Sequence, residues 1–101
     1  MTSTHYKNDR QDRENLIRFT IGYGQTIGRF HVDKGHPNGA EIHEVSSTGI
    51  ITVFNERTNK LVTRMVARPN QIYRYFDSVH KEAPKAVITL ARYHQQMGWN
   101  N

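Results

Sequence analysis

The chain of 101 residues contains no cysteine. This absence excludes a disulfide scaffold, a cysteine-ligated zinc site and thiol chemistry, and it is compatible with a reducing compartment. No apolar run approaches the roughly 18 residues that a membrane-spanning helix needs, and the polar N-terminus lacks the apolar stretch of a signal peptide. We therefore expect a cytoplasmic protein that has no membrane partner.

Acidic residues are absent from residues 57–76, although this segment carries five arginines and lysines. Residues 1–56 and 77–101 have net charges of −1 and +1, so the whole formal charge of +5 lies within this segment. Such a segment favours a polyanionic partner, and the tyrosines beside Arg74 add rings that can stack on bases. We expect it to bind nucleic acid, RNA more than DNA, or the acidic surface of a protein or nucleoprotein. The predicted contact residues are Arg57, Lys60, Arg64, Arg68, Tyr73 and Arg74.

The length and the spacing of apolar residues predict one α+β domain over residues 1–101. Runs rich in β-branched residues, separated by turn-forming sequences, indicate strands, whereas Pro69 and Pro84 are typical of helix starts. The expected elements are a flexible tail at 1–7, a helix from about residue 8, an antiparallel meander with strands at 26–33, 41–47, 49–55 and 60–67, and helices at 69–81 and from 84 onward.

Three glycines, Gly22, Gly24 and Gly28, resemble a phosphate-binding loop only superficially. Their spacing is one residue too long for the dinucleotide-binding fingerprint, and a strand-like segment follows where that motif requires a helix. We interpret them as loop and strand-entry residues and expect no cofactor.

The first predicted hairpin brings several ionisable side chains together. A seven-residue loop between Asp33 and Glu41 predicts that these two residues are opposite each other, and that His31 is opposite His43. Side-chain alternation then puts all four on one polar face, while Phe30, Val32 and Ile42 point to the core. A two-residue turn within residues 46–49 would place Ile51 and Val53 on that core side as well.

A polar face of this composition supports one enzymatic hypothesis, which is metal-independent RNA cleavage. That reaction needs a base for the 2′-hydroxyl, an acid for the leaving oxygen and cations for the charged transition state. His31 and His43 would be the acid and base, Glu41 an alternative base, and Arg64 with Arg68 the phosphate contacts. The alternative is a solvated polar face whose cross-strand pairs have no catalytic role.

Metal binding is a weaker hypothesis for the same residues. His31, Asp33, His36, Glu41 and His43 are suitable ligand types for zinc or manganese. Their spacing matches no established motif, and the arginines nearby would repel a bound cation. We therefore predict no metal site.

The segments FHVDKGHPNGAEIHEV and GIITVFNERTNKLVTRMVARPNQIYRYF resemble small uncharacterised proteins carried by bacterial phages and mobile elements. That resemblance implies a regulator or an inhibitor of host defence, the class that includes anti-CRISPR proteins. A helix followed by a four-stranded sheet with His, Glu and Arg on one face also resembles the barnase, EndoU, colicin and RelE group of ribonucleases. This second resemblance implies acid–base roles for His31, His43 and Glu41, and a phosphate contact for Arg64.

From the sequence we prefer a small binding protein that engages nucleic acid or a nucleoprotein machine through residues 57–76. A toxin-type ribonuclease is the alternative. The two C-terminal helices decide between them, because the enzyme hypothesis fails if they bury the face that carries His31 and His43. Whether the chain forms a dimer is left open.

Overall fold

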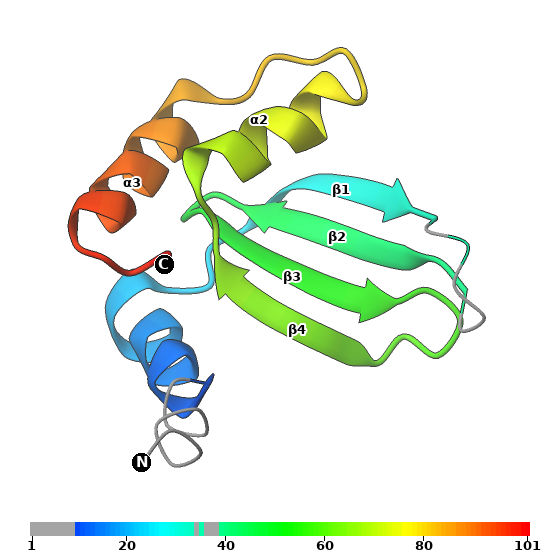
Figure 1. Cartoon of the computed structure of the whole chain (residues 1–101), viewed down its shortest axis with the longest axis horizontal. Helices are drawn as coiled ribbons and strands as arrows, with labels where there is room; N and C mark the ends of the chain where they lie inside the picture. The colour runs from blue at the N-terminus through cyan, green and yellow to red at the C-terminus, as the bar shows by residue number, and fades with distance from the viewer. Residues whose placement is uncertain (1–9, 34, 36–38) are drawn as a thin grey trace.

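The computed structural model describes residues 10–33, 35 and 39–101 and confirms the α+β expectation (Figure 1). A helix over residues 10–16 continues as the π-helical turn η1, and a four-stranded sheet and two helices follow. The predicted tail at 1–7 and the predicted helix start lie outside the described residues. The elements are η1 (Ile17–Ile21), β1 (Thr26–Val32), β2 (Glu41–Ser46), β3 (Ile50–Asn55), β4 (Leu61–Val66), α2 (Pro69–Asp77) and α3 (Lys85–Gln96).

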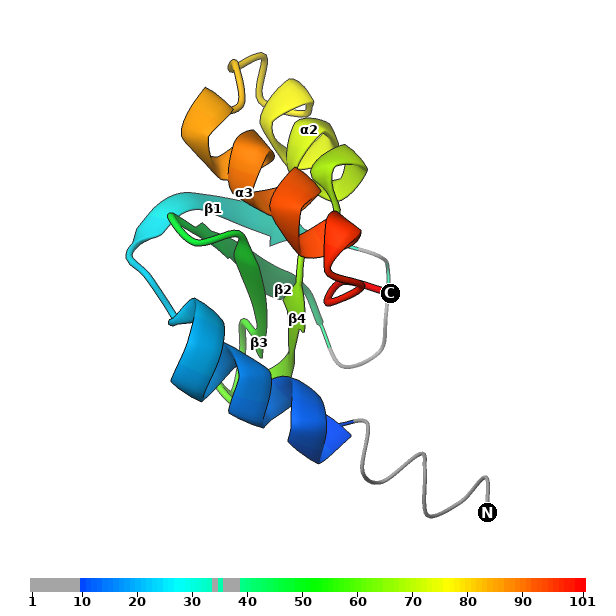
Figure 2. The same ribbon diagram turned by 90° about the vertical axis from the view of Figure 1, so that its left-hand side faces the viewer.

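The four strands form one antiparallel sheet in the order β1-β2-β3-β4, as a meander requires. Helices α2 and α3 cover one face of this sheet, and the N-terminal helix lies on the opposite side (Figure 2). No helix in the described part of the chain is long and apolar enough to cross a bilayer.

Two apolar clusters hold the three layers together. The larger lies between the sheet and α2 and α3, and the smaller joins η1 to β3 and β4. Main members of the larger cluster are Phe30, Val45, Ile51, Val53, Ile72, Phe76, Val87 and Ile88. The smaller contains Ile17, Ile50 and Val66, with Ile21 and Trp99 packed against them.

The predicted pairing of β1 with β2 is wrong by one residue. Phe30 is opposite His43 and His31 is opposite Ile42, so the two histidines lie on different faces. Because paired residues share a face, this register buries Phe30 beside Val45 beneath the C-terminal helices. The prediction failed because β2 has an apolar residue on each face, Ile42 and Val45, and the helices cover the face of Val45.

The turn between β2 and β3 is one residue longer than predicted. The loop consists of residues 47–49, and Gly49 has a φ of +84°, which side chains with a Cβ seldom adopt. As a result Ile51 and Val53 share a face with His43 and Val45, not with Ile42 as expected.

The C-terminal helices begin where the prolines predict. Pro69 is the first residue of α2, and the Gln71 side chain accepts a hydrogen bond from the Arg68 backbone N–H at 2.9 Å. Helix α2 ends at Asp77, four residues earlier than predicted, and His80 adopts a φ of +57° in the turn that follows. This short connection sets α3 beside α2 on the same face of the sheet (Figure 1).

Candidate functional site

The structure divides the residues predicted to cleave RNA between the two faces of the sheet. Glu41 and His43 lie on the face beneath α2, whereas His31 and Arg64 lie on the opposite face. On that opposite face, His31 Nε2 lies 2.9 Å from Glu56 Oε2. The predicted acid–base pair of histidines is therefore not formed, and Arg64, one of the two predicted phosphate contacts, is separated from His43 by the thickness of the sheet.

His43 belongs instead to a chain of hydrogen bonds that includes Tyr75 of α2. Its Nε2 lies 2.9 Å from Glu41 Oε1, and its Nδ1 lies 2.5 Å from the Tyr75 hydroxyl. Because an ionised carboxylate only accepts, we assign the ring proton to Nε2, and the Tyr75 hydroxyl then donates to Nδ1. The side chain of His43 is only 10% exposed, so both ring nitrogens are satisfied without water.

Tyr75 is held as a proton donor. Burial raises the pKa of its phenol, and the negative charge of Glu41 raises it further. Its ring also stacks on Phe30, at 5.1 Å between centroids. These contacts fasten α2 to β1 and β2, and a protonated phenol is a poor nucleophile. From the sequence, Tyr75 was expected, with Tyr73, as a ring beside Arg74 that can stack on bases, whereas in the structure its ring stacks on Phe30 and its hydroxyl meets His43.

Arg64 joins the N-terminal helix to the sheet. Its Nε donates to Thr52 Oγ1 at 3.3 Å, and its Nη1 lies 3.4 Å from Glu14 Oε2. The guanidinium carbon also lies 4.9 Å from the centroid of the Tyr23 ring. Arg64 is thus engaged on the face opposite α2, away from the other cations of its segment.

The basic segment is distributed over the molecule and does not form one surface. Arg57 and Lys60 lie in the turn between β3 and β4, whereas Arg68 and Arg74 lie at the start of α2 and within it. The six residues of β4 separate these groups by about 20 Å. The positive charges are therefore close together along the chain, but strand β4 separates them into two groups in the folded protein.

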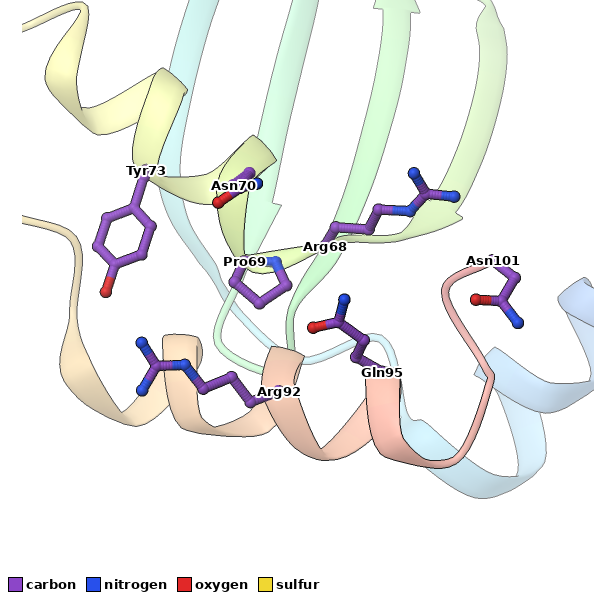
Figure 3. A pocket seen from close by; sticks show the side chains of 7 residues that line it. All are labelled: Arg68, Pro69, Asn70, Tyr73, Arg92, Gln95 and Asn101. Atoms are coloured by element: carbon purple, nitrogen blue, oxygen red, sulfur yellow. The ribbon is translucent and has the colours of Figure 1, made fainter.

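A groove between α2 and α3 gathers cationic and amide side chains (Figure 3). It is open to solvent and has a volume of about 420 Å³. Among the described residues, none that lines it is acidic. Tyr73 and Arg92 extend toward each other across one end, and Arg68 and Asn101 lie at the other. The lining residues are Arg68, Pro69, Asn70, Tyr73, Arg92, Gln95 and Asn101.

A second hollow of about 320 Å³ adjoins this groove and shares Tyr73 and Arg92 with it. Lys85 is the second cation of its lining, and Glu82 is the acidic residue there. The two hollows therefore adjoin each other at Tyr73 and Arg92.

The C-terminal residues hold Arg68 in place. Its Nε donates to the Asn100 backbone oxygen at 2.9 Å. The buried Asn100 amide in turn donates to the backbone oxygens of Ala67 at 3.0 Å and Ala91 at 3.2 Å. Arg92, by contrast, has no ion-pair partner within the described ranges, so its guanidinium is free to take a ligand.

Sequence reasoning found Arg68 and Tyr73 through the local excess of positive charge, but it missed Arg92 and Gln95. These two residues reach the groove from α3, and only the packing of the two helices brings them opposite Tyr73. No signal in the sequence specifies how α2 and α3 pack against each other.

Within residues 10–33, 35 and 39–101 no three His, Asp or Glu side chains are close enough together to hold a metal ion. His36, which belonged to the ligand set considered above, lies outside the described residues. Comparisons of the chain with protein-family models, with curated sequences and with solved structures find no match.

Proposed function

We propose that this protein binds single-stranded nucleic acid, RNA in preference to DNA, in the groove between α2 and α3. The observation that carries the proposal is an open hollow in which Tyr73 faces Arg92 at one end, Arg68 lies at the other end, and no described acidic side chain is part of the lining.

The side chains of the groove match the chemistry of a single strand. Arg68 and Arg92 can each neutralise a phosphate, which releases counterions and drives binding. The Tyr73 ring is 39% exposed and can stack on an unpaired base, a contact worth about 1–3 kcal/mol. A duplex hides these base faces, so the ring favours single strands.

The amides of the groove favour RNA. Asn70, Gln95 and Asn101 each carry a donor and an acceptor, and the 2′-hydroxyl that distinguishes RNA from DNA needs such partners. Arg57 and Lys60, about 20 Å from Arg68, would attract the polyanion at long range without touching the bound nucleotides.

The ribonuclease alternative gains no support from the geometry. His31 and Arg64 lie on the opposite face from His43, and His43 is enclosed by Glu41 and Tyr75. Among the described arginines and lysines, none forms an ion pair with the Glu41 carboxylate.

The proposal is tested by the fluorescence anisotropy of a labelled single-stranded RNA, with single-stranded DNA and duplex RNA as comparisons. We expect Arg92→Glu to weaken RNA binding at least tenfold, because it places a negative charge beside the phosphate path. Arg74→Glu is the matched control, since Arg74 belongs to the same helical layer but does not line the groove, and it should weaken binding less than threefold.

Two results would contradict the proposal. The first is equal loss of RNA binding in the Arg92 and Arg74 variants, because it would show a diffuse electrostatic attraction. The second is binding of polyglutamate at the affinity measured for RNA, which would indicate an acidic protein surface as the partner.

A further inference from the structure

A smaller hollow lies on the opposite face of the sheet, between the N-terminal segment and strands β2 to β4. Its volume is about 170 Å³. Glu44 and Arg64 are charged residues of its lining, Thr52 lies between them on β3, and Tyr23 and Phe54 supply aromatic rings. This set places one anion, one cation and flat apolar surfaces around a space the size of a small ring system.

The register of the sheet places the two charged residues in one row. Glu44 is opposite Thr52, and Thr52 is opposite Arg64, so the three side chains form one row across β2, β3 and β4. Neighbouring strands lie about 4.8 Å apart, which separates the backbones of Glu44 and Arg64 by about 10 Å. Because Arg64 Nε donates to Thr52 Oγ1 on the middle strand, the guanidinium lies nearer to Glu44 than the Arg64 backbone does, and one edge of a small planar ring can meet both charged groups.

Both charged groups have unused hydrogen-bonding capacity. The Glu44 carboxylate contacts Thr26 Oγ1 and Arg29 Nε, and each distance is as long as 3.5 Å. A carboxylate can accept about four hydrogen bonds, and a guanidinium can donate five. Arg64 uses two nitrogens at 3.3 and 3.4 Å, which leaves its other N–H groups free to face the hollow.

The segment that carries Tyr23 is held beside this row, and the Arg64 guanidinium carbon lies 4.9 Å from the centroid of the Tyr23 ring. The Gly22 oxygen accepts from Thr48 Oγ1 at 2.7 Å, and the Gln25 backbone pairs with Ser47. Between them Gly24 has a φ of +71°, and a Cβ there would lie 2.8 Å from the hydroxyls of Ser47 and Thr48. The segment is therefore packed directly on the turn between β2 and β3, and the position of its tyrosine does not depend on a ligand.

We propose that this hollow binds a 2-amino-4-oxopyrimidine ring, the ring that guanine and the pterins share. Its adjacent N–H and amino groups would donate to the Glu44 carboxylate, and its carbonyl oxygen would accept from Arg64. The Thr52 hydroxyl, which accepts from Arg64 Nε, keeps its own proton to donate. Tyr23 and Phe54 would contact the faces of the ring. This site is independent of the proposed groove, which lies on the other side of the sheet (Figure 2).

The test is titration of the protein with GMP, pterin, IMP and AMP, followed by calorimetry and by the amide NMR signals of Gly24 and Thr52. We expect GMP or pterin to bind and to shift the signals of both residues. The ligand that binds more tightly shows whether the ring belongs to a guanine nucleotide or to a pterin. IMP lacks the amino group and should bind at least tenfold more weakly than GMP, whereas AMP turns an acceptor toward Glu44 and should not bind measurably.

Substitutions then test whether Glu44 is the residue that recognises the ring. Glu44→Gln should reduce affinity for the preferred ligand at least tenfold, while Glu56→Gln, at an exposed glutamate after β3, should leave it within twofold. If Glu44→Gln does not fold, Thr52→Val carries the same test. Equal binding of GMP and AMP overturns the inference, as does no binding of either GMP or pterin. Shifts confined to Asn70 and Gln95 also overturn it, because they would assign the mononucleotide to the groove.

Discussion

At the scale of single residues, Tyr75 joins α2 to the sheet through one hydroxyl group. Removing that group as Tyr75→Phe leaves the buried His43 Nδ1 without its donor. We expect the free energy of unfolding to fall by about 1–3 kcal/mol, the usual cost of an unsatisfied buried polar group. Denaturant unfolding measures it, and Tyr73→Phe on the same helix is the control, with an expected change below about 0.5 kcal/mol. A loss no larger than that of the control would mean that the hydrogen bond contributes nothing to stability.

His94 makes the stability of the fold depend on pH. It is 3% exposed, packs on Trp99, and has no hydrogen-bond partner for Nδ1 within the described residues. Burial lowers the pKa of its imidazole below the ordinary 6.5, so between the two values the unfolded chain binds a proton that the folded chain does not. Its contribution to stability is therefore complete above pH 6.5 and is lost as the pH falls through the folded pKa.

Thermal or denaturant unfolding between pH 8 and pH 5 measures this contribution. We expect the wild-type protein to lose more stability on acidification than a His94→Leu variant does. The exposed His80, replaced in the same way, should leave the pH dependence unchanged. Identical pH profiles for the wild type and the His94 variant would contradict the assignment.

At the scale of elements, local patterns predicted the order of helices and strands because the signals were local. Pro69 and Pro84 cannot continue a strand and suit the start of a helix, and the β-branched runs are typical of a sheet. The register of β1 and β2 could not be predicted in the same way, since Ile42 and Val45 offer an apolar residue to either face. Tertiary packing decides it: the helices bury Val45, and Tyr75 supplies the partner that allows His43 to be buried as well.

The groove and the smaller hollow show the same limit for the candidate sites. Arg68 and Tyr73 were predictable from a charge excess within one segment. Arg92 lies on the neighbouring helix. Glu44 lies on β2, and the face of the sheet to which its side chain points depends on the strand register. A residue's role in a site is readable from sequence only where its partners lie close by along the chain.

At the scale of the whole molecule, the two faces of the sheet have different characters. The helical layer carries Arg68, Arg92 and Lys85 in the lining of the two adjoining hollows, and none of these cations forms an ion pair within the described residues. On the opposite face, the cations of β1 and β4 are paired with Glu44 and Glu14. A long polyanion is therefore expected on the helical side, and a small ligand with both donors and acceptors on the other.

The salt dependence of RNA binding measures whether Arg68 and Arg92 contact phosphates in the groove. Each phosphate contact with a single strand contributes about 0.7 to the slope of log K against log salt concentration. We expect Arg68→Gln with Arg92→Gln to reduce the magnitude of this slope by about 1.4, since two phosphate contacts are lost. The paired substitutions Arg57→Gln and Lys60→Gln should leave it nearly unchanged. An unaltered slope in the groove variant, or an equal reduction in the turn variant, would contradict the account.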